Sequence, residues 1–248
     1  MATVYIGGAS IDENGKAHGG KAGNQTGREL RKQKWYMHSK GWRVFRAKDA
    51  QAAAKLAACM AAAVANKHIG YDQHQRNTLY KAAEPFGFDV SKVAVDVECD
   101  CSALVRVCCA YAGITGLPED FRTTNEPKNL LATGAFTEMA GEKYTRQAAC
   151  LRAGDILCTP VQGHTVIVLN DGDKAEPAAD AGQVEITGGT VNVRNAPGTA
   201  GTRVLGVARR GEQLAYRDEA REVDGRPWYR VAWRGGDGWV SSRYAIRV

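Results

Sequence analysis

The sequence predicts an α+β domain followed by a small all-β domain. Helical patterns come first and strand patterns later, which is typical of α+β folds rather than of alternating parallel folds. Residues 170–183 contain Asp-Gly, a proline and a run of small residues, a composition typical of a linker. Beyond it, short alternating runs separated by Gly- and Pro-containing turns indicate a small barrel or sandwich. We therefore expect domains over 1–173 and 184–248, joined by a linker over 174–183.

The expected elements of the first domain follow from periodicity and capping signals. Thr26, with Glu29 three residues later, has the spacing of a capping box and predicts a helix start. Asp49 precedes an alanine-rich run as a helix N-cap. In chain order we expect a strand at 2–11, a helix at 26–37, a strand at 41–47, helices at 49–66, 71–87 and 100–113, and strands at 153–159 and 164–169.

The length, cysteine count and start of the chain limit the class of protein. The 248 residues suffice for two domains with hydrophobic cores. No apolar run approaches the roughly 20 residues needed to span a bilayer, so we expect no stable membrane insertion. The N-terminus lacks the basic start and apolar stretch of a secretory signal, so we expect synthesis in the cytoplasm. Seven cysteines, an odd number, argue against a secreted disulfide framework.

The net charge of +6 is concentrated at the two ends of the chain. Residues 1–50 carry ten Lys/Arg against four Asp/Glu, and residues 184–248 carry eleven Arg against seven Asp/Glu. Basic ends suit a polyanionic partner, such as nucleic acid, an anionic membrane or a bacterial wall. A solvated basic surface explains the same pattern. Because no known nucleic-acid recognition module is present in the sequence, we do not expect nucleic-acid binding.

The stretch 97–113 holds four of the seven cysteines, and helix geometry separates them. We place Asp100 at the N-cap of the helix, where its carboxylate accepts from exposed N–H groups. Cys101 then lies in the first turn, at the positive end of the helix dipole, which lowers a thiol pKa and favours a nucleophile. Cys99 precedes the cap, whereas Cys108 has the position of a small core residue.

Other interpretations of these cysteines stay open at this point. A zinc site would need Cys-x-x-Cys spacing or paired ligand clusters, which the stretch lacks. A redox pair of Cys99 and Cys101 lacks the C-x-x-C spacing. All four cysteines could also be purely structural.

A nucleophilic cysteine needs a base, and His164 is the strongest of five histidines. It follows the loop 159–163 and opens the apolar strand 164–169. A histidine at the edge of a buried strand is both held in place and accessible to substrate. The alternative is a loop-end residue without a function.

Three motifs together resemble the NlpC-type cell-wall peptidases, a family of papain-like cysteine peptidases. They are "DCSALV" at 100–105, with Ala103 where that family has glycine, "RAGDILC" at 152–158 and "GHTVIVL" at 163–169. The resemblance implies an α+β papain-like catalytic domain with Cys101 as nucleophile. It also implies His164 as general base and acid.

The resemblance further implies a third polar residue that orients the histidine, and contacts to the substrate. Twelve positions after His164 stands Glu176, reached through an Asp-Gly turn. The alternatives are Asn170, Gln25 and His18. A tyrosine upstream of the cysteine borders the site in this family, which here suggests Tyr71 and Asp72 as substrate contacts. The glycine-rich segment "GGASIDENGKAHGGKAGNQTGRELR" at 7–31 resembles the opening of certain bacteriophage and prophage endolysins.

The second domain resembles the bacterial SH3-type wall-binding domains over its whole length. The stretch "TVNVRNAPGT" at 190–199 and the strand "GWV" at 238–240 carry that pattern. The resemblance implies a small all-β SH3-like barrel with an aromatic peptide-binding groove, for which we select Trp228, Tyr229 and Trp239. Trp233 and Tyr244 are further aromatic candidates, and about half of the five must pack inside so small a barrel.

Together the resemblances imply a phage- or prophage-type endolysin that acts on peptidoglycan after its release to the wall. We expect cleavage of a stem-peptide amide bond through a thioester, with no cofactor and no metal, by a protein that is a monomer. One alternative is an N-acetylmuramoyl-L-alanine amidase with the same Cys/His chemistry. Another is a catalytically inactive wall-binding protein, suggested by Ala103.

Overall fold

The computed structural model describes residues 3–175, 182–234 and 236–248. The chain divides into two compact units, Met1–Glu176 and Pro177–Val248, and the division falls inside the expected linker. Within the described residues, none of the helices combines the length and the apolar character that crossing a membrane requires.

The first unit is built on a six-stranded sheet whose neighbouring strands are all antiparallel. The strand order is β2-β1-β8-β7-β3-β6, so the N-terminal strand pairs with the strand that follows His164. The strands are β1 (Tyr5–Ala9), β2 (Leu30–Lys34), β3 (Arg43–Ala47), β6 (Phe136–Met139), β7 (Ile156–Cys158) and β8 (Thr165–Val168).

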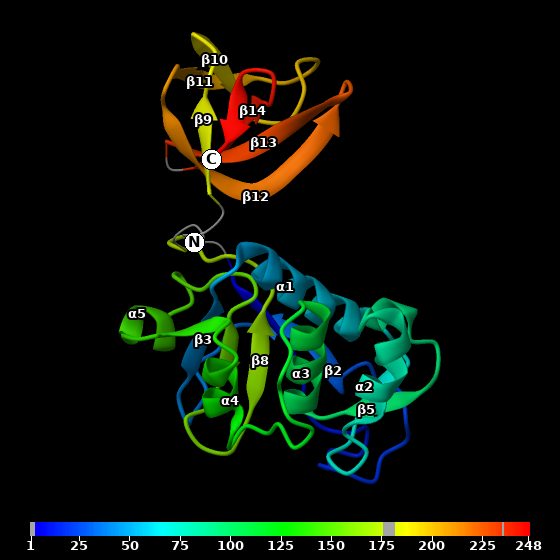
Figure 1. Ribbon diagram of the computed structural model, residues 1–248. Coiled ribbons are helices and arrows are strands. Elements are labelled where there is room, and N and C mark those ends of the chain that lie inside the picture. The colour runs from blue at the N-terminus through cyan, green and yellow to red at the C-terminus, as the bar shows by residue number, and fades with distance from the viewer. Residues whose placement is uncertain (1–2, 176–181, 235) are drawn as a thin grey trace. The chain divides into compact units, whose positions relative to one another are not determined.

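Helices pack on this sheet, and a two-stranded parallel ribbon precedes the cysteine helix (Figure 1). The helices are α1 (Ala50–Ala65), α2 (Thr78–Ala83), α3 (Cys101–Tyr111), α4 (Glu126–Ala132) and α5 (Glu142–Thr145), with 3₁₀ turns at Glu84–Phe86 and Val90–Lys92. The ribbon consists of β4 (Ile69–Tyr71) and β5 (Val97–Cys99). The predicted helices at 49–66 and 100–113 are confirmed, and the Asp49 side chain accepts from the Ala52 N–H at 2.6 Å as an N-cap.

The two faces of the sheet bury separate hydrophobic clusters. On one face α1 and α3 contact each other and the sheet, burying Leu56, Leu104 and Ile167 with many other side chains. Ile6 and Val166 belong to the cluster on the opposite face. Because β8 contributes to both clusters, it is buried on both sides, which holds the residues at its ends firmly in place.

The predicted helix at 26–37 is wrong. The Glu29 carboxylate accepts from the N–H groups of Gln25 and Thr26 at 2.7 and 3.1 Å, as in a capping box, but these bonds close a turn. The following residues form β2, paired with β1. Pairing buries Leu30 against the core, and this tertiary gain outweighs the local helix signal.

All regular elements of the second unit's described residues are strands, in agreement with the predicted all-β domain. They form an antiparallel sheet in the order β11-β10-β14-β13-β12-β9-β15. The strands are β9 (Gln183–Ile186), β10 (Thr190–Arg194), β11 (Val204–Arg209), β12 (Gln213–Val223), β13 (Arg226–Trp233), β14 (Gly236–Ser241) and β15 (Ala245–Arg247). Gly206 is needed for close packing, because a Cβ there would lie 2.8 Å from the Trp233 ring.

Candidate functional site

Cys101 occupies the first turn of α3, as the sequence predicts. The Asp100 side chain caps this helix and accepts from the Ala103 N–H at 2.7 Å. Cys101 is 7% exposed, so its thiol is close to the surface but largely shielded from water.

A buried arginine fixes the start of this helix. The Nε and Nη2 of Arg76 donate to the two carboxylate oxygens of Asp100 at 2.6 and 3.0 Å. The same Nη2 donates to the Ser102 hydroxyl at 2.9 Å and to the Phe121 carbonyl at 2.5 Å. A bidentate pair of this kind restricts orientation as well as position, so the turn that presents Cys101 is rigid. Sequence reasoning missed Arg76, because it lies 24 residues before Asp100.

The start of β8 lies close to Cys101. Strand β8 packs against α3, and the backbone N–H of Thr165 lies within hydrogen-bonding reach of the Cys101 sulfur. Because His164 directly precedes Thr165, its backbone lies in the same region.

Burial sets the protonation of both groups. The pKa of the Cys101 thiol is raised to about 12, mainly by burial and then by the carboxylates of Asp100 and Glu126, while the N–H groups of Thr165 and Ser102 oppose the shift. For His164, burial lowers the pKa to about 4, helped by His38 and Arg31. The resting pair is therefore a neutral thiol and a neutral imidazole. We expected the helix dipole to lower the thiol pKa, but loss of hydration outweighs it.

The buried glutamate Glu126 lies next to Thr165 at the start of β8. Glu126, at the start of α4, has no exposed surface, and its carboxylate accepts from the Thr165 hydroxyl at 2.7 Å. Burial raises the pKa of Glu126 to about 8, although the Thr165 hydroxyl and the Cys158 thiol stabilise the carboxylate. Nothing in the local sequence "TTNEPKN" distinguishes this residue, so sequence reasoning did not select it.

An aromatic loop between β2 and β3 borders His164. The rings of Trp42 and His164 are 6.5 Å apart between centroids, and His38 lies 5.1 Å from Trp42. The Lys40 ammonium donates to the Gln162 carbonyl at 2.5 Å, which ties the loop to the residues before His164. In the sequence, the cluster of aromatic residues in "WYMHSKGW" was the signal that could have identified this loop as part of the site.

Tyr71 lies near the thiol, whereas Asp72 is occupied by the backbone. Burial raises the pKa of Tyr71, and electrostatic interaction with Cys101 adds to this shift, which places the phenol near the sulfur. The Asp72 carboxylate accepts from the N–H groups of Gly19, His74 and Gln75 at 2.6, 2.5 and 2.9 Å. Burial alone would raise the pKa of Asp72, but these hydrogen bonds lower it. Through its bond to Gly19, Asp72 thereby holds the glycine-rich loop between β1 and β2, residues 10–29.

The expected third residue, Glu176, lies outside the described residues. Its alternative Asn170 ties strand ends together, since its Oδ1 accepts from the Tyr5 N–H at 2.9 Å at the far end of β8 from His164. β8 pairs with β1 on one side and with β7 on the other. Beside the β7 edge, the Thr159 N–H donates to the His164 carbonyl at 3.0 Å, and beside the β1 edge the residues level with His164 come from the N-terminal segment. Continuing the register Gly7↔Ile167 places Ser10 opposite His164.

The other two alternatives make contacts of their own. The His18 ring stacks on His74 at 4.1 Å between centroids. The Gln25 amide donates to the Ala22 and Gly23 carbonyls at 2.8 and 3.3 Å. Both side chains therefore stabilise the glycine-rich loop.

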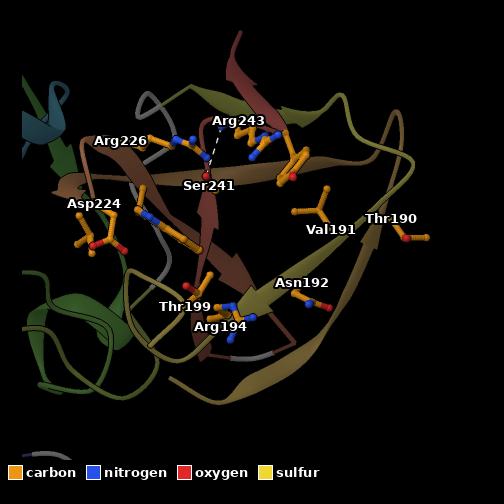
Figure 2. A pocket seen from close by; sticks show the side chains of 12 residues that line it. Thr190, Val191, Asn192, Arg194, Thr199, Asp224, Arg226, Ser241 and Arg243 are labelled. Carbon is orange, nitrogen blue, oxygen red and sulfur yellow. Dashed lines mark hydrogen bonds between the residues drawn. The ribbon is translucent and has the colours of Figure 1, made fainter. Parts of the chain in front are cut away.

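The second unit contains a pocket of about 520 Å³ (Figure 2). Of the three aromatic residues selected from the sequence, only Trp228 is among the described residues that line this pocket. Tyr244, one of the two further candidates, also lines it. Trp239 is buried, with the Arg221 guanidinium 5.5 Å from its ring. Tyr229 packs edge-on against Tyr216 at 5.9 Å.

Comparison with protein families gives two matches along the chain. A model described as an endolysin-like domain matches residues 6–175, and one described as a bacterial SH3 domain matches residues 189–245. The chain belongs to the endolysin-like domain family. Searches of curated proteins and of solved structures found no match.

The order of the two matches confirms the predicted architecture, an endolysin-like domain followed by a bacterial SH3 domain suited to binding the cell wall. This combination supports a peptidoglycan hydrolase.

Proposed function

We propose that this peptidoglycan hydrolase has a papain-like catalytic domain and cleaves an amide bond with Cys101 as nucleophile and His164 as general base. The observation that supports this most is the position of the Thr165 N–H, next to His164 in the chain and within reach of the Cys101 sulfur. Cys101 lies in α3 and His164 directly precedes β8, and both elements are buried in the core. Rigid elements of this kind hold catalytic groups more precisely than loops do.

The neutral resting pair determines the first step. His164 takes the thiol proton as the Cys101 sulfur attacks the amide carbonyl carbon, so the thiolate forms only during attack. Backbone N–H groups at the start of α3 stabilise the oxyanion. The protonated imidazole then donates its proton to the leaving amine, and a thioester remains. Water, deprotonated by His164, hydrolyses the thioester and restores the free thiol.

The group that orients His164 has two candidates. Glu176 is proposed from the sequence spacing, and His38 from its position on the aromatic loop beside Trp42. Substituting each by Ala and measuring kcat on soluble muropeptides distinguishes them, because loss of the orienting group lowers kcat much more than it raises KM.

The bond we favour is an amide of the stem peptide, which would make the protein an endopeptidase of the phage or prophage type, acting after release to the wall. An amidase that cuts the muramoyl link would use the same Cys101 and His164 chemistry. Digestion of purified muropeptides followed by mass spectrometry identifies the new termini. Free L-alanine amino termini would show amidase activity and overturn the endopeptidase proposal.

The alternative of an inactive wall-binding protein rested on Ala103 and on the open assignment of the third catalytic residue. In the structure Ala103 is buried, and its N–H is bonded to the Asp100 carboxylate, so the methyl group fits without disturbing the helix start. This observation favours the active enzyme. Absence of new termini on every wall in a panel of purified walls would favour the binding protein.

A further inference from the structure

The pocket of the second unit is lined mainly by polar and basic side chains from strands that are far apart in the sequence. It lies between β10, the turn from β12 to β13, and the end of β14. Its volume of about 520 Å³ is within the range of sites for small ligands or short peptide segments. The lining residues that carry charge are Arg194, Arg226, Arg243 and Asp224.

These three arginines have no carboxylate partner among the described residues. Elsewhere in the same unit Arg217 and Arg230 both pair with Asp237, at 2.8 and 2.5 Å. By contrast, the contacts of Arg194 are to the Thr202 hydroxyl and carbonyl, at 3.1 and 3.3 Å. The pocket therefore has an excess of positive charge that the unit does not neutralise in the part of the chain described.

The arginines lie in two groups (Figure 2). Arg226 and Arg243 lie around Ser241, whereas Arg194 lies with Thr199 on the other side of the pocket. The Ser241 hydroxyl accepts from the backbone N–H of Arg243 at 3.3 Å, which leaves the hydroxyl hydrogen available to a ligand. This arrangement suits a ligand that carries two separated anionic groups.

The remaining lining residues suit a peptide. Tyr244, which is 42% exposed, offers aromatic surface for aliphatic side chains, with a smaller contribution from the buried Trp228. The Asn192 side chain offers both a donor and an acceptor for an amide. A guanidinium matches a carboxylate in a bidentate way. A polyphosphate chain would use the arginines but would have little use for the aromatic surface.

We propose that this pocket binds a short peptide through at least two of its carboxylates, and that in the wall the ligand is the acidic stem peptide rather than the glycan or an anionic polymer. The identification of the ligand as a stem peptide rests on the proposed function, whereas the carboxylate chemistry of the pocket does not. The pocket would thus be a binding site separate from the catalytic cysteine, selecting walls by the free carboxylates of their peptides.

The test uses the full chain with Cys101→Ala, so that binding is measured without turnover. The probe is a purified soluble muropeptide with free carboxylates, compared with the same muropeptide after amidation of those carboxylates, and calorimetry gives Kd. Arg226→Gln and Arg243→Gln should each weaken binding about tenfold or more, as expected for a lost charged hydrogen bond. Arg210→Gln, the same charge change at an exposed residue outside the pocket, should change Kd less than about twofold.

Amidation of the muropeptide should weaken its binding as strongly as the pocket variants do. Equal binding of both muropeptides, or an equal effect of Arg210→Gln, would overturn the proposal. So would binding only to walls that retain teichoic acid, since that result assigns the pocket to phosphate. Unchanged melting temperatures show that the variants fold, and competition by free glutamate tests the site without any substitution.

Failure of the proposed function is measured separately, as hydrolysis of muropeptides by the chain with Cys101 intact. Carboxylate-dependent binding without hydrolysis would leave the pocket proposal standing, whereas hydrolysis without carboxylate-dependent binding would overturn it alone.

Discussion

The hydroxyl of Thr165 donates to the carboxylate of Glu126 at 2.7 Å, and the N–H of the same threonine lies close enough to the Cys101 sulfur to lower its thiol pKa. Thr165 therefore links a fully buried acid to the proposed nucleophile. The bond fixes the start of β8, and with it the residue before, His164.

Glu126→Gln tests this link. With a pKa near 8 the acid is largely protonated at neutral pH, so the amide should leave the rate of Cys101 alkylation nearly unchanged at pH 7. Above pH 9 the ionised acid raises the thiol pKa, so the variant should react about two- to tenfold faster than wild type. The measurement is the iodoacetamide rate constant against pH. Identical profiles of wild type and variant at every pH would show that Glu126 does not influence the pKa of the Cys101 thiol.

Limited alkylation should distinguish the cysteines of the 97–113 stretch. Cys99 is fully buried and burial raises its pKa far above normal, whereas Cys101 keeps a small exposed surface. Near neutral pH, iodoacetamide should therefore label Cys101 before Cys99. Cys150 is the most exposed of the seven cysteines, so the experiment is done in a Cys150→Ser background. Peptide mapping in which Cys99 carries the first label would contradict the assignment.

The acid side of the pH profile should report His164. Its pKa near 4 leaves the imidazole neutral, and thus able to act as a base, down to unusually low pH. His38 lowers that pKa, so His38→Gln should move the acid limb of kcat/KM upward by about half a unit. Arg31→Gln should shift it in the same direction. A downward shift in either variant would be inconsistent with this electrostatic interaction.

Glu98 should make stability depend on pH. It is 4% exposed, neither carboxylate oxygen has a hydrogen-bond partner among the described residues, and burial raises its pKa from 4.5 to about 8. The carboxylates of Asp72, Glu29, Glu13 and Asp12 add to the shift. Because the native state keeps a proton that the unfolded chain has lost, the contribution to stability is complete below pH 4.5 and is lost as pH rises through 8.

Glu98→Gln removes this dependence. The variant should be more stable than wild type by about 1–3 kcal/mol at pH 9 and nearly equal to it at pH 4. Urea unfolding at the two pH values measures the difference. The control, Glu142→Gln, changes an exposed residue and should have a small effect at both. A stabilisation that is as large at pH 4 as at pH 9 would contradict the role of the buried proton.

Local signals in the sequence were sufficient for the elements that present the nucleophile. The alanine-rich run after Asp49 and the cap at Asp100 specify α1 and α3 through contacts within a few residues, so both were predictable. In the second domain, short alternating runs and turns predicted the all-β architecture. Periodicity and capping are local, which is why they are legible without a structure.

What the sequence could not provide depends on contacts between distant residues. The Glu29 carboxylate accepts from the Thr26 N–H, which is one of the two bonds of a capping box, yet pairing with β1 turns the next residues into a strand. Arg76 and Glu126 join the site from other parts of the chain. The high thiol pKa of Cys101 comes from burial, which no local pattern reports.

The most direct test of the account measures hydrolysis of purified walls and soluble muropeptides by the wild type, Cys101→Ala and His164→Ala. We predict that each substitution lowers kcat/KM by about 10³-fold or more, and that the double variant is hardly worse than either alone, because the two residues act as a unit. The matched control Cys99→Ala changes a neighbouring cysteine and should remain active if it folds. Equal hydrolysis by wild type and Cys101→Ala would contradict the central claim.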